Sequence, residues 1–334
     1  MASLSSLDLG SEMGDLLDDN KLAESAVLLL PPNIPLTCFP VIIEKILSTL
    51  MEREWKQLSE RAQNYLKWTS VKAESVDVLA PKDVTPPTKG FEMLSIDRDG
   101  RSFGGMMEQC KELGIPSILI RFSSLIAALI TLRLLKRQTD ISHSNLATLR
   151  FTQNVDSDYL NYPMALKLLL ELFPECKNMF YFEVNEHVTK DYLPTIRTLA
   201  EDLGIGFVLD DSNKMDPEVH WKLLDLTNWI KIDFHATLLL ERYLAANKGE
   251  EIIAHFEKYA SGSGSRVIVL EGLGDESPLK TFLQENWKYD QTSLYYQSRE
   301  RLPVAPWDRY FGLIQDYRPN DFGLFFKGLI TKSK

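Results

Sequence analysis

Four short apolar runs in the sequence each end in an acidic side chain. They are Met179–Glu183, Ile205–Asp211, Trp229–Asp233 and Arg266–Glu271. The chain between neighbouring runs is long enough for at least one helix. A carboxylate at the end of a buried strand is costly to desolvate, so its repetition indicates that the charges converge on something positive. The pattern favours a divalent metal site at the mouth of a parallel barrel.

The composition narrows the class of protein. The chain has 334 residues, 44% of them apolar and 25% charged, which is typical of a soluble globular protein with one large α/β domain or two ordinary domains. Its formal net charge of −10 argues against a protein that binds nucleic acid polymers, because such proteins present concentrated Lys and Arg to phosphates. A small phosphate-bearing ligand is compatible with this charge if a metal supplies the positive charge.

Several features indicate a cytoplasmic protein. The three cysteines lie far apart and form no CxxC pair, which is typical of a reducing compartment. The N-terminus lacks the basic start and apolar core of a secretory signal. Residues Ser117–Leu135 are apolar enough to suggest a membrane span, but Arg121 and Arg133 interrupt them. A buried helix is therefore the preferred interpretation, and we expect no membrane span.

Residues 1–66 are predicted to form an acidic, helical extension. Pro31 and Pro32 end any helix that begins before them. From Val41 to about Trp68 the apolar residues recur at helical spacing. This stripe predicts a helix that packs on the main domain, or one that binds a protein partner or a second copy of the chain. The stripe alone does not say what covers it, and we favour packing on the main domain.

Strand-like and helix-like runs alternate from Phe91 onward. About seven strands can be counted, and Ser75–Leu79 is a candidate eighth. The alternation implies parallel β/α units, and a span of roughly 250 residues fits a TIM-type (β/α)8 barrel. The alternative is an open doubly wound sheet, but no glycine-rich phosphate turn follows an early strand. We predict an α/β barrel over residues 67–300 and a C-terminal extension over 301–334 that packs on it.

Oxygen-bearing side chains are expected at one face of this barrel, because the C-terminal ends of its strands all open there. The candidates are Glu92, Asn154, Glu183, Asp210, Asp211 and Glu271. Hard cations such as Mg²⁺ or Mn²⁺ prefer such ligands, and the lack of His and Cys among them argues against zinc. The adjacent pair Asp210 and Asp211 is unfavourable unless a cation separates the two charges.

Lys231 lies among these acids, two residues before Asp233. A lysine beside carboxylates is commonly a structural ion-pair partner. Beside two metal ions it can instead position a water or neutralise charge that builds on a phosphate. Each acid taken alone is compatible with the solvated strand end of a generic α/β protein. A series that includes an acid pair, this lysine and Asn154 is not.

Six segments resemble, in order and approximate spacing, the signature of EAL domains, the phosphodiesterases of the bacterial messenger cyclic di-GMP. The segments are Gly90–Leu94, Asn154–Asp156, Phe182–Glu186, Leu209–Asp211, Ile230–Asp233 and Leu270–Gly272. Glu92-Met93-Leu94 matches imperfectly the tripeptide from which the family takes its name. The resemblance covers about residues 70–300.

The resemblance implies a modified (β/α)8 barrel that holds two divalent ions, Mg²⁺ or Mn²⁺. It implies that one phosphodiester of cyclic di-GMP is opened to give linear pGpG. The metal ligands it implies are the six oxygen donors named above. Glu92 and Glu271 are implied to be catalytic together with Lys231, which would lie close to the attacking water.

Further roles follow from the same resemblance. Glu186 matches the second acid of a strand-end motif and is expected to support the loop after Asp211. Asp233 is expected to contact the substrate. The family's late glutamine has two candidates here, Gln291 and Gln297, and we assign the substrate contact to Gln291.

Two departures from the family pattern bear on activity. The family's phosphate-gripping arginine is replaced by Ile96, and its glycine-supported loop is replaced by Ser212–Met215, which has no glycine. Two functions therefore stay open. One is an active metal-dependent phosphodiesterase, which we favour because the predicted metal ligands keep their oxygen donors. The other is a catalytically inactive EAL-like module that binds cyclic di-GMP or a protein partner and acts as a regulator.

Overall fold

A computed structural model describes residues 39–80, 89–138, 149–174, 179–185, 187–211, 217–224, 226–227, 229–260, 266–288 and 292–299. Eight strands in this part of the chain form a closed barrel in sequence order. They are β1 (Ser70–Ala80), β2 (Lys89–Ile96), β3 (Leu149–Val155), β4 (Phe180–Val184), β5 (Gly206–Leu209), β6 (Trp229–Ile232), β7 (Arg266–Leu273) and β8 (Thr292–Ser298). The predicted α/β barrel is confirmed.

The first strand runs against the other seven. The strands from β2 to β8 pair in parallel, whereas β1 pairs antiparallel with β2 and with β8. The expectation of parallel units throughout is therefore wrong at this one strand. Residues 81–88 are too few for the helical crossover that a parallel connection needs, so β1 and β2 form a hairpin.

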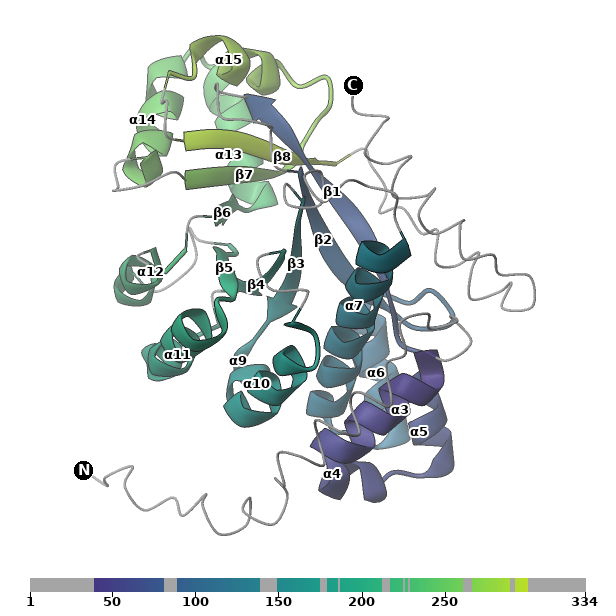
Figure 1. Ribbon diagram of the computed structural model, residues 1–334. Helices are drawn as coiled ribbons and strands as arrows, with labels where there is room; N and C mark the ends of the chain where they lie inside the picture. The colour runs from purple at the N-terminus through teal and green to yellow at the C-terminus, as the bar shows by residue number, and fades with distance from the viewer. Residues whose placement is uncertain are drawn as a thin grey trace.

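Helices follow every strand from β2 to β7 and surround the barrel (Figure 1). They are α6 (Phe103–Leu113), α7 (Ser117–Gln138), α9 (Ser157–Leu160), α10 (Pro163–Glu171), the 3-10 helix η4 (Lys190–Tyr192), α11 (Leu193–Leu203), α12 (Pro217–Leu224), α13 (Phe234–Ala245), α14 (Gly249–Ala260) and α15 (Pro278–Asn286). Their buried residues recur at helical spacing, as Ile196, Leu199 and Leu203 do on α11. The apolar stripe of such a helix is the face that packs against the barrel.

Three helices of the described residues precede the barrel where the sequence predicted one continuous stripe. They are α3 (Phe39–Leu50), α4 (Glu52–Lys56) and α5 (Glu60–Lys67). A new helix begins at α5 because the Ser59 side chain caps it, accepting a hydrogen bond from the Ala62 amide at 3.2 Å. Helices α3 and α5 pack on α7, which confirms that the stripe packs on the main domain.

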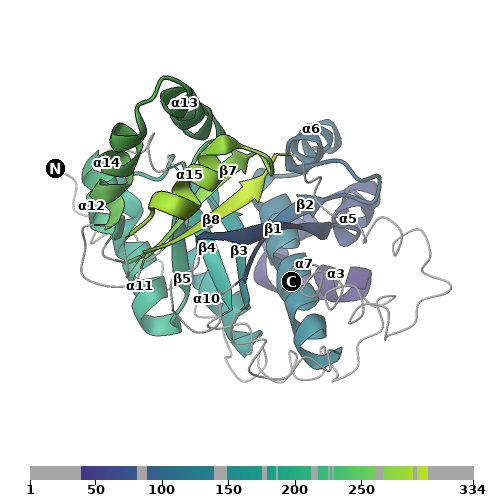
Figure 2. The ribbon, with the colours of Figure 1, turned by 90° about the horizontal axis from the view of Figure 1, so that it is seen from above.

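Helix α7 is buried along most of its length, from Phe122 to Arg133. Figure 2 shows α3, α5 and α6 beside it on one side of the barrel, with α11, α12 and α14 on the other. The two arginines that interrupt its apolar sequence have partners within the protein: Arg121 forms an ion pair with Asp156, and the Arg133 guanidinium lies 4.5 Å from the centre of the Phe173 ring. The predicted buried helix is confirmed, and no described helix is long and apolar enough to cross a membrane.

An apolar layer fills the lower part of the barrel interior. It consists of Val76, Val208, Trp229, Val269 and Tyr295, all buried. Gly90 of β2 makes room for it, because a Cβ there would lie 2.9 Å from Val76 Cβ and 3.2 Å from the Trp229 ring. The barrel is closed at this level, so any chemistry is confined to the level above.

Candidate metal centre in the barrel

A polar layer lies directly above the apolar one. On a parallel strand the next inward-facing residue is two positions towards the C-terminal end. Trp229 is followed in this way by Lys231, Val269 by Glu271 and Tyr295 by Gln297. The same step leads to Glu92, Asn154, Glu183 and Asp210 on the remaining parallel strands. Strand alternation thus brings the predicted site residues to one level of the barrel.

Lys231 lies at the centre of this layer and is buried. Its Nζ atom is 2.6 Å from Glu271 Oε1, 2.9 Å from Glu183 Oε2, 3.1 Å from Glu92 Oε2 and 3.4 Å from Asp210 Oδ1. Side chains from five different strands or strand ends therefore meet at one point. The convergence predicted from the sequence is present.

The carboxylates of β2 and β4, which we call the closed half, are bound by protein groups. Glu92 accepts hydrogen bonds from Asn154 Nδ2 at 2.9 Å and Gln297 Nε2 at 2.7 Å, in addition to the central ammonium group. Glu183 accepts one from the Thr152 hydroxyl and another from the same ammonium group. All four oxygens of the closed half accept a hydrogen bond within the protein.

The acids at the ends of β5 and β7, which we call the open half, are Asp210, Asp211 and Glu271. One oxygen from each lies within 4.8 Å of the others, close enough to share a metal ion. Asp210 Oδ1 is buried and accepts no hydrogen bond from the described residues, although Lys231 Nζ lies 3.4 Å away as an ion-pair partner. A buried oxygen without a donor fits a cation ligand.

The backbone explains how two adjacent aspartates reach one point. Consecutive side chains of a regular strand face opposite sides. Asp211 leaves the strand in the left-handed region, with φ of 46°, which is uncommon for a residue other than glycine. The chain also bulges directly after Glu271, where Gly272 has φ of 63° and the Phe234 ring occupies the space of a Cβ. Both irregularities occur beside the open half.

Burial and neighbouring charges shift the pKa values of the acids and the lysine in this layer. Burial raises the pKa of Glu183 well above its usual range, and Glu92 raises it further. Burial, with nearby Asp210, raises the pKa of Glu271 to about 7. Burial acts the same way on Glu92, but Lys231 and hydrogen bonds outweigh it and lower its pKa. The lysine itself stays protonated, because the acids more than offset burial and raise its pKa.

These shifts have a chemical consequence for the site. One ammonium group lies within 3.4 Å of four carboxylates, and Asp211 lies beside them, so the acids of this layer cannot all ionise without a further cation. Carboxylate and amide oxygens are the ligands that Mg²⁺ and Mn²⁺ prefer. Asn154 turns its amide nitrogen to Glu92, which leaves its carbonyl oxygen for such an ion. The donor set present therefore fits divalent cations of this kind.

Sequence reasoning missed one member of the layer, Glu74, and chose Gln291 over another, Gln297. Glu74 of β1 lies opposite Glu92 in the hairpin, and burial, with Glu92, raises its pKa to about 7. Gln297 is the glutamine that reaches Glu92. Alternation favours Gln297, which follows Tyr295 by two residues. Glu74 precedes Val76 by two residues, and placing it in this layer also requires knowing that β1 runs the other way.

Other predicted site residues lie elsewhere or are not described. Asp233 is buried at the N-terminus of α13, where its Oδ1 accepts a hydrogen bond of 2.6 Å from the Ala236 amide. This capping role accounts for an acid here, and a substrate contact stays a prediction. Glu186, Gln291 and residues 212–216 lie outside the described residues, as do residues 1–38 and 300–334.

The replacement of the family's arginine by Ile96 has a structural counterpart. Ile96 is the last residue of β2 and is 2% exposed, within the main hydrophobic core. An apolar side chain at this place provides no group to bind phosphate. The position therefore serves packing in this protein.

Comparison with solved structures relates this barrel to EAL domains. The EAL enzyme Bd1971, in a form with cAMP and cyclic di-GMP bound, matches with a TM-score of 0.54 and 14% identity over 82% of this chain and 69% of that one. The PaMucR phosphodiesterase in complex with cyclic di-GMP matches with a TM-score of 0.51 and 18% identity over 77% of this chain and 98% of that one.

A third match extends the likeness to another bacterium. The EAL-domain protein of Listeria monocytogenes EGD-e gives a TM-score of 0.50 and 14% identity over 78% of this chain and 99% of that one. No protein-family model matches the chain, and no curated protein matches it in sequence. The chain thus has the fold of EAL domains with a strongly diverged sequence.

Proposed function

We propose that this protein is a divalent-metal-dependent phosphodiesterase that hydrolyses cyclic di-GMP to pGpG. The observation that carries the proposal is the meeting of Glu92, Glu183, Asp210 and Glu271 within 3.4 Å of one buried lysine. Solvated strand ends have no reason to converge in this way, since buried like charges repel. Acids that together bind cations, in contrast, must converge.

The residues that would hold the ions are the six predicted ligands. One oxygen from each of Asp210, Asp211 and Glu271 already lies within 4.8 Å of the others. When bound, two divalent cations supply polarisation of the phosphate oxygens and a water that ionises near neutral pH. The reaction would need no covalent nucleophile from the protein.

The remaining side chains of the layer would act by position and charge. Lys231 keeps its proton and can offset negative charge that builds on a phosphate. Gln297 and Asn154 fix the orientation of Glu92 through hydrogen bonds to its two oxygens. Such supporting bonds hold a ligand in place before the ion arrives.

The choice of cyclic di-GMP as the substrate rests on structural similarity to proteins that bind it. Two structures that share this fold, Bd1971 and PaMucR, hold cyclic di-GMP. The proposal extends their ligand to this chain. The same two comparisons support a module that works with cyclic di-GMP whether or not it cleaves it.

A regulator without catalysis is the second candidate. The observation that favours it is Ile96, which is buried where the EAL pattern has a phosphate-binding arginine. Loss of that contact weakens the hold on a reacting phosphate more than it weakens the hold on a whole dinucleotide. In this case the protein would bind cyclic di-GMP, or a protein partner, and act by contact.

Incubation of the purified protein with cyclic di-GMP and Mn²⁺ or Mg²⁺ distinguishes the candidates. Release of pGpG that stops on addition of EDTA supports the enzyme. Saturable binding without turnover supports the regulator. If neither turnover nor binding is observed, a module that contacts other proteins remains.

A matched pair of variants ties the activity to the site. Glu92→Ala is expected to abolish turnover while the circular dichroism spectrum is unchanged. Glu201→Ala, on an exposed part of α11, is expected to keep the wild-type rate. Unchanged turnover in Glu92→Ala would remove Glu92 from the site.

A further inference from the structure

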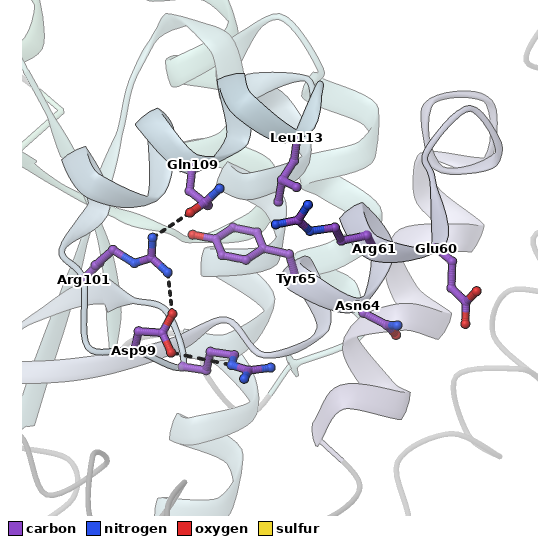
Figure 3. A pocket seen from close by; sticks show the side chains of 9 residues that line it. Glu60, Arg61, Asn64, Tyr65, Asp99, Arg101, Gln109 and Leu113 are labelled. Carbon is purple, nitrogen blue, oxygen red and sulfur yellow. Dashed lines mark hydrogen bonds and ion pairs between the residues drawn. The ribbon is translucent and has the colours of Figure 1, made fainter.

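A second pocket lies outside the barrel, between α5, the turn after β2 and α6 (Figure 3). Its volume is about 520 Å³, within the range of sites for small molecules. Its walls carry three arginines, Arg61, Arg98 and Arg101, together with Tyr65 and Leu113. This gathering of guanidinium groups occurs in a chain whose formal net charge is −10.

The floor of the pocket is held by one buried aspartate. Asp97 accepts hydrogen bonds from the amides of Asp99 and Arg101, both at 2.9 Å, and from the Tyr65 hydroxyl at 3.0 Å. Burial, with the Asp97 charge, raises the pKa of Tyr65, so the phenol stays protonated and keeps donating. The turn and α5 are thereby fixed to each other, which gives the pocket a defined shape.

One of the three arginines is used by the protein itself. The Arg101 guanidinium contacts Asp97 at 2.8 Å, Gln109 at 2.7 Å and also Asp99. Two of its five donors are hydrogen-bonded within the wall, to Gln109 and Asp99, and its Nε faces Asp97 in an ion pair. Arg101 therefore builds the pocket and has little capacity for a ligand.

The other two arginines keep their donors for a ligand. Arg98 is 64% exposed, and its one ion pair among the described residues, to Asp99, is long at 3.6 Å. Arg61 has no hydrogen-bond or ion-pair partner among the described residues. Figure 3 shows its guanidinium group beside Leu113 and the Tyr65 ring, while the Glu60 carboxylate points away. Two guanidinium groups from separate segments thus border one space with an aromatic wall.

We propose that this pocket binds a small phosphate monoester with a flat organic part. Guanidinium groups bind phosphate oxygens through paired N–H donors, and two of them suit a dianion. The Tyr65 ring and Leu113 offer an apolar surface to the remainder of the ligand. The site is separate from the barrel centre, so the inference does not depend on the proposed function.

Calorimetry with phenyl phosphate and inorganic phosphate tests the proposal. The titrations are run with EDTA, because without divalent ions the acidic barrel layer repels phosphate. We expect phenyl phosphate to bind more tightly than inorganic phosphate. The double variant Arg61→Ala/Arg98→Ala is expected to lose about tenfold or more in affinity, since each phosphate–guanidinium contact is charge-assisted. Arg53→Ala, an exposed arginine of α4 outside the pocket, is the control and keeps wild-type affinity.

A chemical footprint on the wild-type protein gives the location independently of any variant. Phenylglyoxal modifies accessible arginines, and mass spectrometry identifies them. Saturating phenyl phosphate is expected to protect Arg61 and Arg98 but not Arg53. The proposal is overturned if no saturable binding occurs, if protection spreads equally over all three arginines, or if a folded double variant binds as well as the wild type.

Discussion

The two halves of the charged layer differ in what balances them. In the closed half, every oxygen of Glu92 and Glu183 accepts a hydrogen bond from a protein group. In the open half, oxygens of Asp210, Asp211 and Glu271 lie within 4.8 Å of one another, and Lys231 Nζ lies 2.6 Å from Glu271 but 3.4 Å from Asp210. The same lysine thus serves both halves, and the closer grouping of acids in the open half favours an additional cation from solution there.

This division explains how so acidic a layer folds before it binds metal. A buried carboxylate needs a partner or must take up a proton. In the closed half, Lys231 and hydrogen bonds lower the pKa of Glu92, although burial raises that of Glu183. In the open half, burial raises the pKa of both Asp210 and Glu271 and so favours their protonated forms. Metal binding there would replace protons with an ion.

Removal of the lysine should have the largest effect on both halves. Lys231→Met keeps the length of the side chain but leaves four carboxylates without their cation. We expect the free energy of unfolding, measured with urea in EDTA at alkaline pH, to fall by about 3–5 kcal/mol. The hydrolysis of cyclic di-GMP should also be lost.

The control is a lysine at the surface. Lys248 pairs with Glu251 on the same segment, and the two side chains are 47% and 53% exposed. Lys248→Met should leave the free energy of unfolding close to that of the wild type, because exposed ion pairs are screened by solvent. Equal losses in the two variants would mean that the layer does not depend on its central charge.

A change in the open half should remove the response to metal and spare the closed half. Asp211→Asn keeps a side chain that tolerates a positive φ and removes one negative charge. Wild-type protein should gain about 2.7 kcal/mol of stability at a Mn²⁺ concentration of about 100 times the dissociation constant. The variant should lose most of this gain in thermal denaturation. Asp202→Asn, exposed on α11, should keep it in full, and a full gain in Asp211→Asn would exclude Asp211 as a ligand.

A change in the closed half should affect catalysis more than metal-free stability. Gln297→Ala removes the 2.7 Å hydrogen bond to Glu92. Loss of such a supporting bond costs about 10–100-fold in activity or metal affinity. We expect that loss in the rate of pGpG formation, with Gln291→Ala close to wild type. The reverse order would restore the assignment made from the sequence.

The open half also predicts a pH dependence of the metal-free protein. The pKa of Glu271 rises from 4.5 to about 7 on folding, so the folded state retains a proton that the unfolded state releases in this range. The resulting stabilisation is complete below pH 4.5 and is lost as pH rises towards 7, by about 3 kcal/mol. Urea denaturation at several pH values measures it. Stability that increases over this window would contradict the shift.

Most of the fold was accessible from the sequence because each strand is a short apolar run. The strand at Trp229 and the helix at Pro217–Leu224 begin at the expected residues. The direction of β1 was not accessible, since alternation along a strand is the same in either direction. The breaks between α3, α4 and α5 were also missed, because the apolar stripe continues across them.

The site residues that could be predicted are those that belong to local sequence motifs. Acids at strand ends, such as Glu183 and Glu271, follow from the parallel arrangement. Glu74 was missed because its level in the barrel depends on the antiparallel hairpin. The close approach of Asp210 and Asp211 depends on a positive φ at Asp211, which no local sequence pattern predicts.

Calorimetric titration of the metal-free wild-type protein with Mn²⁺, at neutral pH and in two buffers of different ionisation enthalpy, tests the central claim directly. We predict saturable binding with a net release of protons, because ions in the open half displace protons from acids such as Glu271. No saturable binding, or binding without proton release, would contradict a cation site at the open half of the barrel.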